Sequence, residues 1–123
     1  MLTFYLSFIL AISGLAFNPT SQLNESEARL VLIAAGWDPA VHDQAIDVLY
    51  CESSGFPARV GDGGNSLGLF QIQWTPTTWP GWRYAPGFES FHNVNLVNPI
   101  DNALIARLIY EQHGWDPWTC KPS

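Results

Sequence analysis

The sequence is short of positive charge. Five Lys and Arg residues stand against eleven Asp and Glu residues, which leaves a formal net charge of −6 at pH 7. The five are scattered singly along the chain, at Arg29, Arg59, Arg83, Arg107 and Lys121. Proteins that follow a phosphate backbone or bind an anionic membrane surface need clustered lysine and arginine. The sequence therefore argues against nucleic acid and against an anionic lipid surface as partners.

Cysteine is also scarce, because the chain contains only Cys51 and Cys120. The three histidines, His42, His92 and His113, stand alone, so no zinc or redox motif is visible, and we expect neither a metal nor a cofactor. An even count in a small exported chain favours one disulfide, whereas two buried free thiols would fit a cytosolic protein. In the chain-entropy model, closing so long a loop stabilises the fold by roughly 4 kcal/mol.

Apolar and aromatic residues are plentiful. The 123 residues are 47% hydrophobic and include six Trp, four Tyr and seven Phe, with 13% charged. This is enough apolar mass for the core of one modest domain, and it excludes a disordered tail or a solvating linker.

The first seventeen residues carry no charged side chain and are almost wholly apolar. Gly14 and Ala16 present small residues two apart, so we expect residues 1–16 to be a signal peptide, followed by a linker over 17–24 and a domain over 25–123. The segment lacks the usual basic residues. The alternatives are an uncleaved membrane anchor, although the run is shorter than the roughly 20 residues a span needs, and a buried core helix. Export to the cell envelope or beyond is the preferred interpretation.

The rest of the chain predicts three helices, over residues 24–36, 38–55 and 98–114. Each begins at an Asn or Asp that can cap a helix. The first has Glu three residues after its cap, and the other two have Pro directly after theirs. Residues 57–86 are rich in Gly, Pro, Thr and Asn, which predicts loops with a short hairpin around Leu69–Gln73. The expected fold is mainly helical, of the α+β class, with a small irregular hairpin.

One carboxylate falls in an unusual place on the second predicted helix. Val41, Ala45, Val48 and Glu52 follow at steps of four, three and four, so all four share one helical face. Burial and the negative end of the helix dipole both raise the pKa of such a carboxyl group. A Glu held protonated near neutral pH can act as a general acid. Alternatively, the helix frays before Glu52 and its side chain points to solvent.

A second carboxylate, Asp62, lies in the loop Gly61–Ser66, where no helix cap or helix dipole accounts for it. A loop Asp flanked by Gly is often a turn former and is sometimes catalytic. Residue types alone leave both interpretations open.

Two motifs resemble a known superfamily. Tyr-Cys-Glu-Ser-Ser-Gly at residues 50–55, followed by Gly-Asp-Gly-Gly-Asn-Ser-Leu-Gly-Leu-Phe-Gln-Ile at 61–72, looks like the lysozyme-like domain of the lytic transglycosylases and goose-type lysozymes. The resemblance covers roughly residues 25–120. The tail Gly-Trp-Asp-Pro-Trp-Thr-Cys at 114–120, with a Cys directly before the Glu, is also similar to resuscitation-promoting factors. Those cell-wall lysins carry a disulfide between the positions that match Cys51 and Cys120.

The resemblance implies a role for each motif residue. Glu52 would be the catalytic acid that protonates the glycosidic oxygen between N-acetylmuramic acid and N-acetylglucosamine in peptidoglycan. Asp62 would be an auxiliary that positions water. A hairpin strand carrying Gln71 would face Glu52, and residues 69–72 would line one wall of a glycan cleft. The implied substrate-binding or Glu-shaping residues are Ser53, Ser54, Phe70, Gln71, Gln73 and one of Tyr84 and Tyr110, which could replace the Tyr of a missing Ala-Tyr-Asn motif.

Three outcomes remain open at this stage. Gln73 stands where goose-type lysozymes show a second Asp, which favours a lytic transglycosylase with a single Glu. The alternatives are a hydrolytic lysozyme that uses Asp62 and a non-catalytic cell-wall-binding module. The net charge of −6 is unusual for a lysin. It argues for modest processivity, a high-salt habitat or a specific local partner, and only weakly for the binding module. In each case the expected partner is the peptidoglycan glycan strand, bound by a monomer.

Overall fold

The computed structural model describes residues 20–74, 87–91 and 94–123. The predicted signal peptide over 1–16 and Tyr84 lie outside these residues. No helix in the described part is long and apolar enough to cross a membrane. Leu23, which the sequence analysis assigned to a linker, is buried, and its backbone N–H donates to the Gly55 carbonyl at 2.9 Å. The end of the expected linker is therefore packed against the domain.

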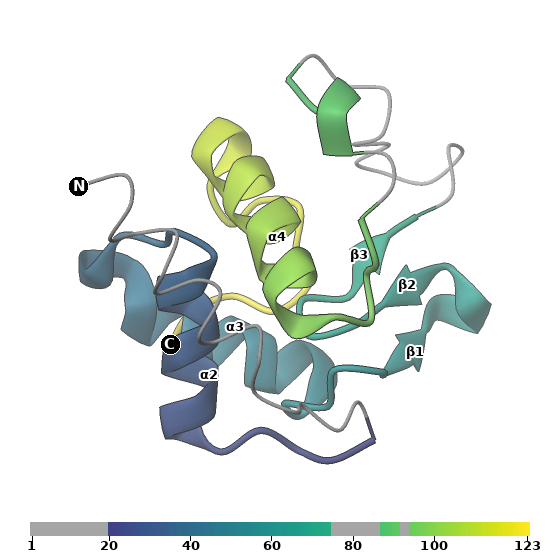
Figure 1. The fold of residues 1–123 in the computed structure, drawn as a ribbon, viewed down its shortest axis with the longest axis horizontal. Helices are drawn as coiled ribbons and strands as arrows, with labels where there is room; N and C mark the ends of the chain where they lie inside the picture. Colours follow the sequence, from purple (N-terminus) through teal and green to yellow (C-terminus); the bar gives the residue numbers. More distant parts are fainter. Residues whose placement is uncertain (1–19, 75–86, 92–93) are drawn as a thin grey trace.

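In the described part of the chain, three α-helices stand beside a small antiparallel sheet (Figure 1). Helix α2 packs against α3 and α4, and α4 also contacts the third strand. The mixture of helices with a small sheet agrees with the α+β class. The elements in chain order are α2 (Glu25–Ala34), η1 (Pro39–Val41), α3 (His42–Ser53), β1 (Val60–Gly61), η2 (Asp62–Gly64), β2 (Ser66–Leu67), β3 (Ile72–Gln73), η4 (Glu89–Phe91) and α4 (Pro99–His113).

The capping residues act where the sequence predicts them. The Asn24 Oδ1 atom accepts from the Glu27 N–H at 2.8 Å, and the Glu27 Oε1 atom accepts from the Asn24 N–H at 2.9 Å. Asn98 caps α4 in the same manner. The second predicted helix begins later than expected, because Asp38 caps only the short 3-10 helix η1 and α3 begins after it, at His42.

The hairpin predicted around Leu69–Gln73 is present, but it begins earlier, at Ser66. Strands β2 and β3 pair with Ser66 opposite Gln73 and Leu67 opposite Ile72, while residues 68–71 form the turn between them. Gln71 therefore lies in a turn with φ of 49°, and the expectation that a strand carries it is wrong. Gly68 opens this turn with φ of 81°, and a Cβ there would lie 2.2 Å from the Asn102 Nδ2 atom. The close approach of α4 explains why the turn begins at a glycine.

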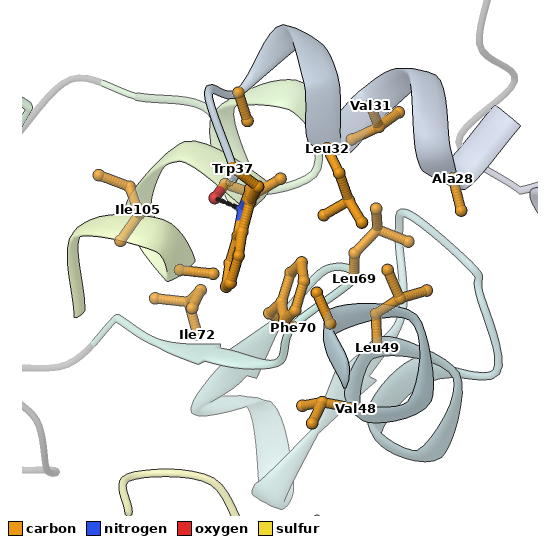
Figure 2. Packing of buried hydrophobic residues seen from close by; sticks show 14 of the residues in the cluster. Ala28, Val31, Leu32, Trp37, Val48, Leu49, Leu69, Phe70, Ile72 and Ile105 are labelled. Carbon is orange, nitrogen blue, oxygen red and sulfur yellow. Dashed lines mark hydrogen bonds between the residues drawn. The ribbon is translucent and has the colours of Figure 1, made fainter. Parts of the chain in front are cut away.

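The core lies between the helices and this turn (Figure 2). Trp37 stacks on Phe70 with ring centroids 5.5 Å apart, and its Nε1–H donates to the Ala103 carbonyl at 2.8 Å. Leu69 and Phe70 are fully buried in this cluster. The expectation that both side chains line the wall of a cleft is therefore wrong, because the two side chains pack in the centre of the domain.

One buried amide joins α4 to the hairpin. The Asn102 Oδ1 atom accepts from the Phe70 N–H at 2.8 Å, and the Nδ2 atom donates to the Leu67 and Leu96 carbonyls, each at 2.9 Å. Asn102 is fully buried, so these bonds replace water for three backbone groups.

Asn102→Ala should therefore destabilise the fold severely. Each buried group left without its partner costs about 1–3 kcal/mol, so we expect the free energy of unfolding to fall by about 3 kcal/mol or more. Urea unfolding measures the change. Gln112→Ala, at an exposed position of the same helix, is the control and should change stability by less than about 0.5 kcal/mol. Equal effects of the two substitutions would contradict the assigned role.

Candidate active site

Glu52 lies in the last turn of α3, and hydrogen bonds of Ser53 stabilise this helix end. Helix α3 continues to Ser53, whose Oγ donates to the Leu49 carbonyl at 2.9 Å and accepts from the Gly55 N–H at 3.2 Å. Ser54 then ends the helix with φ of 56°. The helix does not fray before Glu52, and this side chain is half-buried on the same face as buried residues of α3.

A cleft of about 380 Å³, its open mouth included, begins at Glu52. It has three walls, formed by the end of α3, by the sheet with its turns, and by the C-terminal tail with one residue of α4. The residues that line it are Glu52, Asp62, Ser66, Gln71, Ile72, Gln73, Ile109, Pro117, Trp118 and Thr119. A second hollow, lined by Gln73, His113, Asp116 and Pro117, shares two of these residues.

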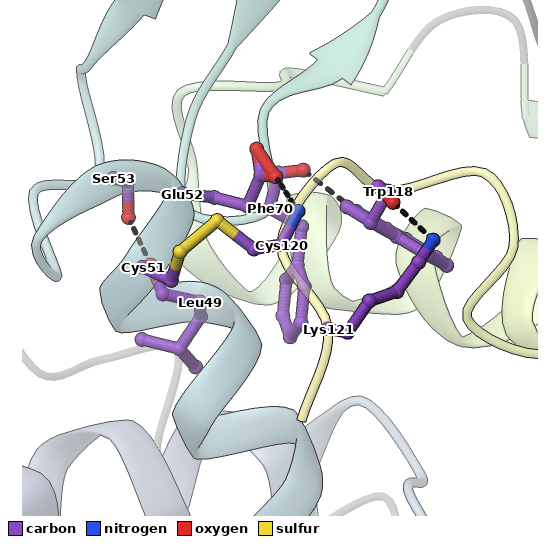
Figure 3. The surroundings of a disulfide bond; sticks show 8 residues. All are labelled: Leu49, Cys51, Glu52, Ser53, Phe70, Trp118, Cys120 and Lys121. Carbon is purple, nitrogen blue, oxygen red and sulfur yellow. Dashed lines mark hydrogen bonds between the residues drawn. A yellow bond between two sulfur atoms is a disulfide. The ribbon is translucent and has the colours of Figure 1, made fainter. Parts of the chain in front are cut away.

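The tail is fastened directly beside Glu52 (Figure 3). Cys51 and Cys120 form the predicted disulfide, with their Cα atoms 6.0 Å apart. The Cys120 N–H donates to the Glu52 Oε1 atom at 3.1 Å. The disulfide therefore holds the backbone amide that contacts the carboxyl group of Glu52.

Burial raises the pKa of the Glu52 carboxyl group above its ordinary value. The Cys120 N–H opposes this shift in pKa because it stabilises the ionised form, the negative charge of Asp62 adds to it, and the positive charge of Lys121 opposes it. The net effect is that Glu52 keeps its proton to a higher pH than an exposed glutamate does. A protonated carboxyl group facing a cleft can donate its proton to a bound molecule.

Asp62 lies across the same cleft from the sheet side. It is the first residue of η2, has φ of 51°, and its Oδ2 atom accepts from the Ser66 Oγ–H at 2.6 Å. The structure thus brings the two sequence-predicted carboxylates, Glu52 and Asp62, to one cleft. Helix-capping and periodicity patterns in the sequence could not predict that the two residues meet, because the position of the Asp62 loop depends on how the strands pair.

Gln71 and Gln73 both line the cleft, in different ways. The Gln71 Nε2 atom donates to the Arg59 and Gly68 carbonyls, each at 3.0 Å, so the side chain braces the turn it belongs to. Its Oε1 atom lies so close to Gly61 that a Cβ there would be 2.1 Å away. Gln73 lies on β3 opposite Ser66 and borders both the cleft and the second hollow.

Ser53, Ser54, Phe70 and Tyr110, the other predicted binding residues within the described part of the chain, do not line the cleft. Ser53 is buried and bonded within the helix end, and the Ser54 carbonyl accepts from the Gln22 side chain at 2.6 Å. Phe70 belongs to the core. Tyr110 packs its ring against Trp37 and Trp115, with centroids 5.4 and 4.5 Å away.

Sequence reasoning missed the wall formed by Pro117, Trp118 and Thr119. Trp118 is buried and fixed by its Nε1–H, which donates to the Phe70 carbonyl at 2.9 Å. The sequence feature that could have predicted this wall is that the three residues directly precede Cys120, whose disulfide partner Cys51 directly precedes Glu52. Whatever lies just before Cys120 must then lie near that carboxyl group.

Comparison of this chain with protein-family models, curated proteins and solved structures found no match. Within the described residues, no group of three or more His, Cys, Asp or Glu side chains is arranged to hold a metal ion.

Proposed function

We propose that this chain has a lysozyme-like domain and cleaves peptidoglycan as a lytic transglycosylase. The bond broken is the β-1,4 linkage between N-acetylmuramic acid and N-acetylglucosamine, and Glu52 is the single general acid and base. The observation that carries the proposal is the half-buried Glu52 carboxyl group, whose pKa is raised and which opens into a cleft. A carboxylic acid in this setting is the type of group that protonates a glycosidic oxygen.

The reaction needs one carboxyl group used twice. Glu52 gives its proton to the glycosidic oxygen as the bond to the anomeric carbon breaks, which releases the N-acetylglucosamine hydroxyl group. The resulting carboxylate then accepts the proton of the muramic acid O6 hydroxyl as that oxygen attacks the anomeric carbon. The product is a 1,6-anhydro ring, and no water is consumed.

Hydrolysis is the second candidate, because Asp62 lines the same cleft as Glu52. In this case Asp62 would position a water molecule, and the product would carry a reducing muramic acid end. The Oδ2 atom of Asp62 already accepts from the Ser66 hydroxyl, which is the arrangement of a loop-bracing residue. For this reason we favour the transglycosylase reaction.

The disulfide also supports action outside the cytoplasm. A disulfide in a small domain is typical of an oxidising compartment, and peptidoglycan lies in such a compartment. We therefore propose that the protein works in the cell envelope or is secreted, with the apolar segment over 1–16 serving its export.

The test is mass spectrometry of the muropeptides that the oxidised full-length chain releases from purified peptidoglycan. We expect products lighter by one water than the hydrolytic products, with anhydro-muramic ends. Reducing muramic ends would replace the transglycosylase by the hydrolase. If the folded, oxidised protein releases nothing, a wall-binding module becomes the better explanation.

The variant Asp62→Asn provides a second test that distinguishes the transglycosylase from the hydrolase. If the reaction is that of a transglycosylase, we expect its rate to stay within about threefold of wild type, since an Asn still accepts from Ser66. A hydrolase that depends on Asp62 would lose about 100-fold or more. The measurement is the initial rate of muropeptide release. The control is Glu111→Gln, an exposed carboxylate on α4 that removes the same charge.

A further inference from the structure

The only lysine of the chain, Lys121, follows Cys120 directly. Its ammonium group donates to three backbone carbonyls of the segment that follows α4. The acceptors are Trp115 at 2.9 Å, Asp116 at 3.2 Å and Trp118, the last of which Figure 3 draws. An ammonium group has three donors and no acceptor, so this arrangement uses its full capacity.

These three bonds close the tail into a loop. The same segment provides the Pro117, Trp118 and Thr119 wall of the cleft, and its next residue supplies the amide that contacts Glu52. Lys121 therefore bonds to the chain on both sides of Pro117. Without the ammonium group, the wall would lose these three bonds and keep the Trp118 indole bond at 2.9 Å, the Trp118 N–H bond to the Trp115 carbonyl at 3.1 Å, its ring contacts and the disulfide.

The charge of Lys121 also acts on Glu52. Besides burial, the groups that shift the pKa of the Glu52 carboxyl group are Asp62 from the sheet side and, from the tail, Lys121 and the Cys120 amide. The rest of the cleft lining is uncharged: polar and apolar side chains of the sheet, its turns and the tail, and the apolar Ile109 of α4. Lys121 and the amide oppose the rise in the pKa of Glu52 that burial and Asp62 cause.

We propose that Lys121 is a positioning residue of the Glu52 site, because its ammonium group binds the carbonyls of residues 115, 116 and 118 and so holds the cleft wall and the Cys120 amide against Glu52. The proposal deepens the proposed function and rests on it for its catalytic consequence. Its structural consequence, the placement of the Cys120 amide, is measurable without any substrate.

The variant Lys121→Met keeps the length of the side chain and removes the ammonium group. Hydrogen exchange in the full chain should show the Cys120 amide exchanging about tenfold faster or more, while the amides in the middle of α4 keep their wild-type rates. Unchanged exchange at Cys120 would overturn the proposal. Equal acceleration throughout α4 would also overturn it, because Lys121 would then be a general stabiliser.

The catalytic consequence of the proposal is tested by the kinetics of Lys121→Met with peptidoglycan as the substrate. We expect kcat/KM of Lys121→Met to fall about 10- to 100-fold, since a displaced wall or amide misplaces the reacting groups. The alkaline limb of the pH profile should move to higher pH, because the cation that opposes the pKa rise of Glu52 is gone. Lys121→Arg keeps the charge but not the three-carbonyl geometry, so it should retain the wild-type pH limb and recover part of the rate.

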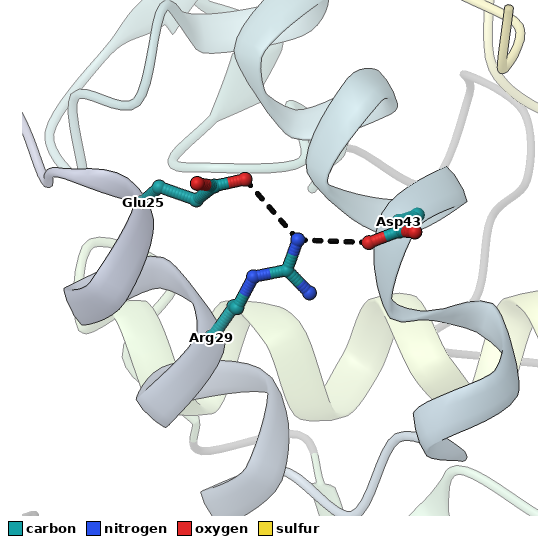
Figure 4. A network of polar contacts seen from close by, with 3 residues as sticks. All are labelled: Glu25, Arg29 and Asp43. Atoms are coloured by element: carbon teal, nitrogen blue, oxygen red, sulfur yellow. Dashed lines mark hydrogen bonds and ion pairs between the residues drawn. The ribbon is translucent and has the colours of Figure 1, made fainter.

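A matched control for the lost charge is Arg29→Met. Arg29 bridges Glu25 on α2 and Asp43 on α3 at 3.1 and 2.8 Å (Figure 4), and none of the three lines the cleft. We expect the activity of this variant to stay within about twofold of wild type, because a charge at the surface and away from the cleft is screened by salt. Wild-type activity in Lys121→Met would overturn the proposal. If even wild-type protein cleaves no peptidoglycan, the proposed function fails, and the exchange at Cys120 still decides the role of Lys121.

Discussion

Glu52→Gln should remove the proposed glycan cleavage and leave the fold intact. The amide has the size of the carboxyl group and can still accept from the Cys120 N–H, but it has no proton to give to a glycosidic oxygen. General acid catalysis contributes about 10²- to 10⁴-fold, so we expect kcat/KM on peptidoglycan to fall within or beyond this range. The measurement is the initial rate of muropeptide release.

The stability of this variant is its internal control. The raised pKa of Glu52 means that the folded chain holds this proton more tightly than the unfolded chain. The stabilisation that results is fully present below the unfolded pKa and is lost as pH rises through the folded pKa. At neutral pH, Glu52→Gln should therefore unfold at the same or a higher denaturant concentration than wild type.

The exposed Glu111→Gln variant, with the same chemical change on α4, should keep wild-type activity. If Glu52→Gln is folded and still lyses cell walls at the wild-type rate, the catalytic role of Glu52 is excluded. Loss of lysis with retained binding to peptidoglycan would instead support the proposed chemistry.

The pH profile offers a further check on the same group. The proposed reaction uses Glu52 in its protonated form, so kcat/KM should fall as pH rises through its pKa. Burial raises that pKa, so the fall should occur at higher pH than for an ordinary glutamate. An alkaline limb at the ordinary glutamate value would show that the environment of the carboxyl group differs from the one described.

Removal of the disulfide should have the largest effect on stability. Cys51 and Cys120 are 69 residues apart in the sequence, and closing a loop of that length stabilises the fold by roughly 4 kcal/mol in the chain-entropy model. We expect the double variant Cys51→Ala, Cys120→Ala to lose about this free energy of unfolding. The tail would also lose its anchor beside Glu52, so cleavage of peptidoglycan should fall as well.

Guanidinium unfolding with and without a reducing agent measures this effect in the native sequence. The double variant is the matched control, because reductant should not change its midpoint. Equal midpoints for oxidised and reduced wild-type protein would contradict the stabilising role. Full activity of the reduced, folded protein would show that the tail stays beside Glu52 without the covalent bond.

Local features of the fold could be predicted from the sequence because their causes are local. The capping box joins Asn24 to Glu27, three positions further on, and the Asn98 cap binds the N–H groups of Ile100 and Asp101. Such interactions need no partner from elsewhere in the chain. One helix begins later than predicted, at His42 instead of Asp38. The short 3-10 helix η1 occupies the residues in between, and the rest of the helix forms as expected.

The cleft depends on contacts that no local pattern carries. Gln71 was expected on a strand and lies in a turn, because the register of β2 and β3 and the approach of Asn102 from α4 determine where the hairpin bends. Phe70 was expected in the wall and fills the core, because Trp37 and Trp118 pack against its ring. The contacts of Phe70 with Asn102 and with Trp118 join residues more than 30 positions apart.

The sequence by itself determined the three helices, the periodicity that puts Glu52 in line with the apolar face of its helix, and the two cysteines that could pair. The structure then showed that this helix continues past Glu52. Only the tertiary structure decided what surrounds Glu52. The Cys120 N–H that contacts its carboxyl group comes from 68 residues away, and the opposite wall comes from the turn that contains Asp62. The physical reason is that helix caps and periodicity act within a few residues, whereas a cleft forms only where distant segments pack together and exclude water.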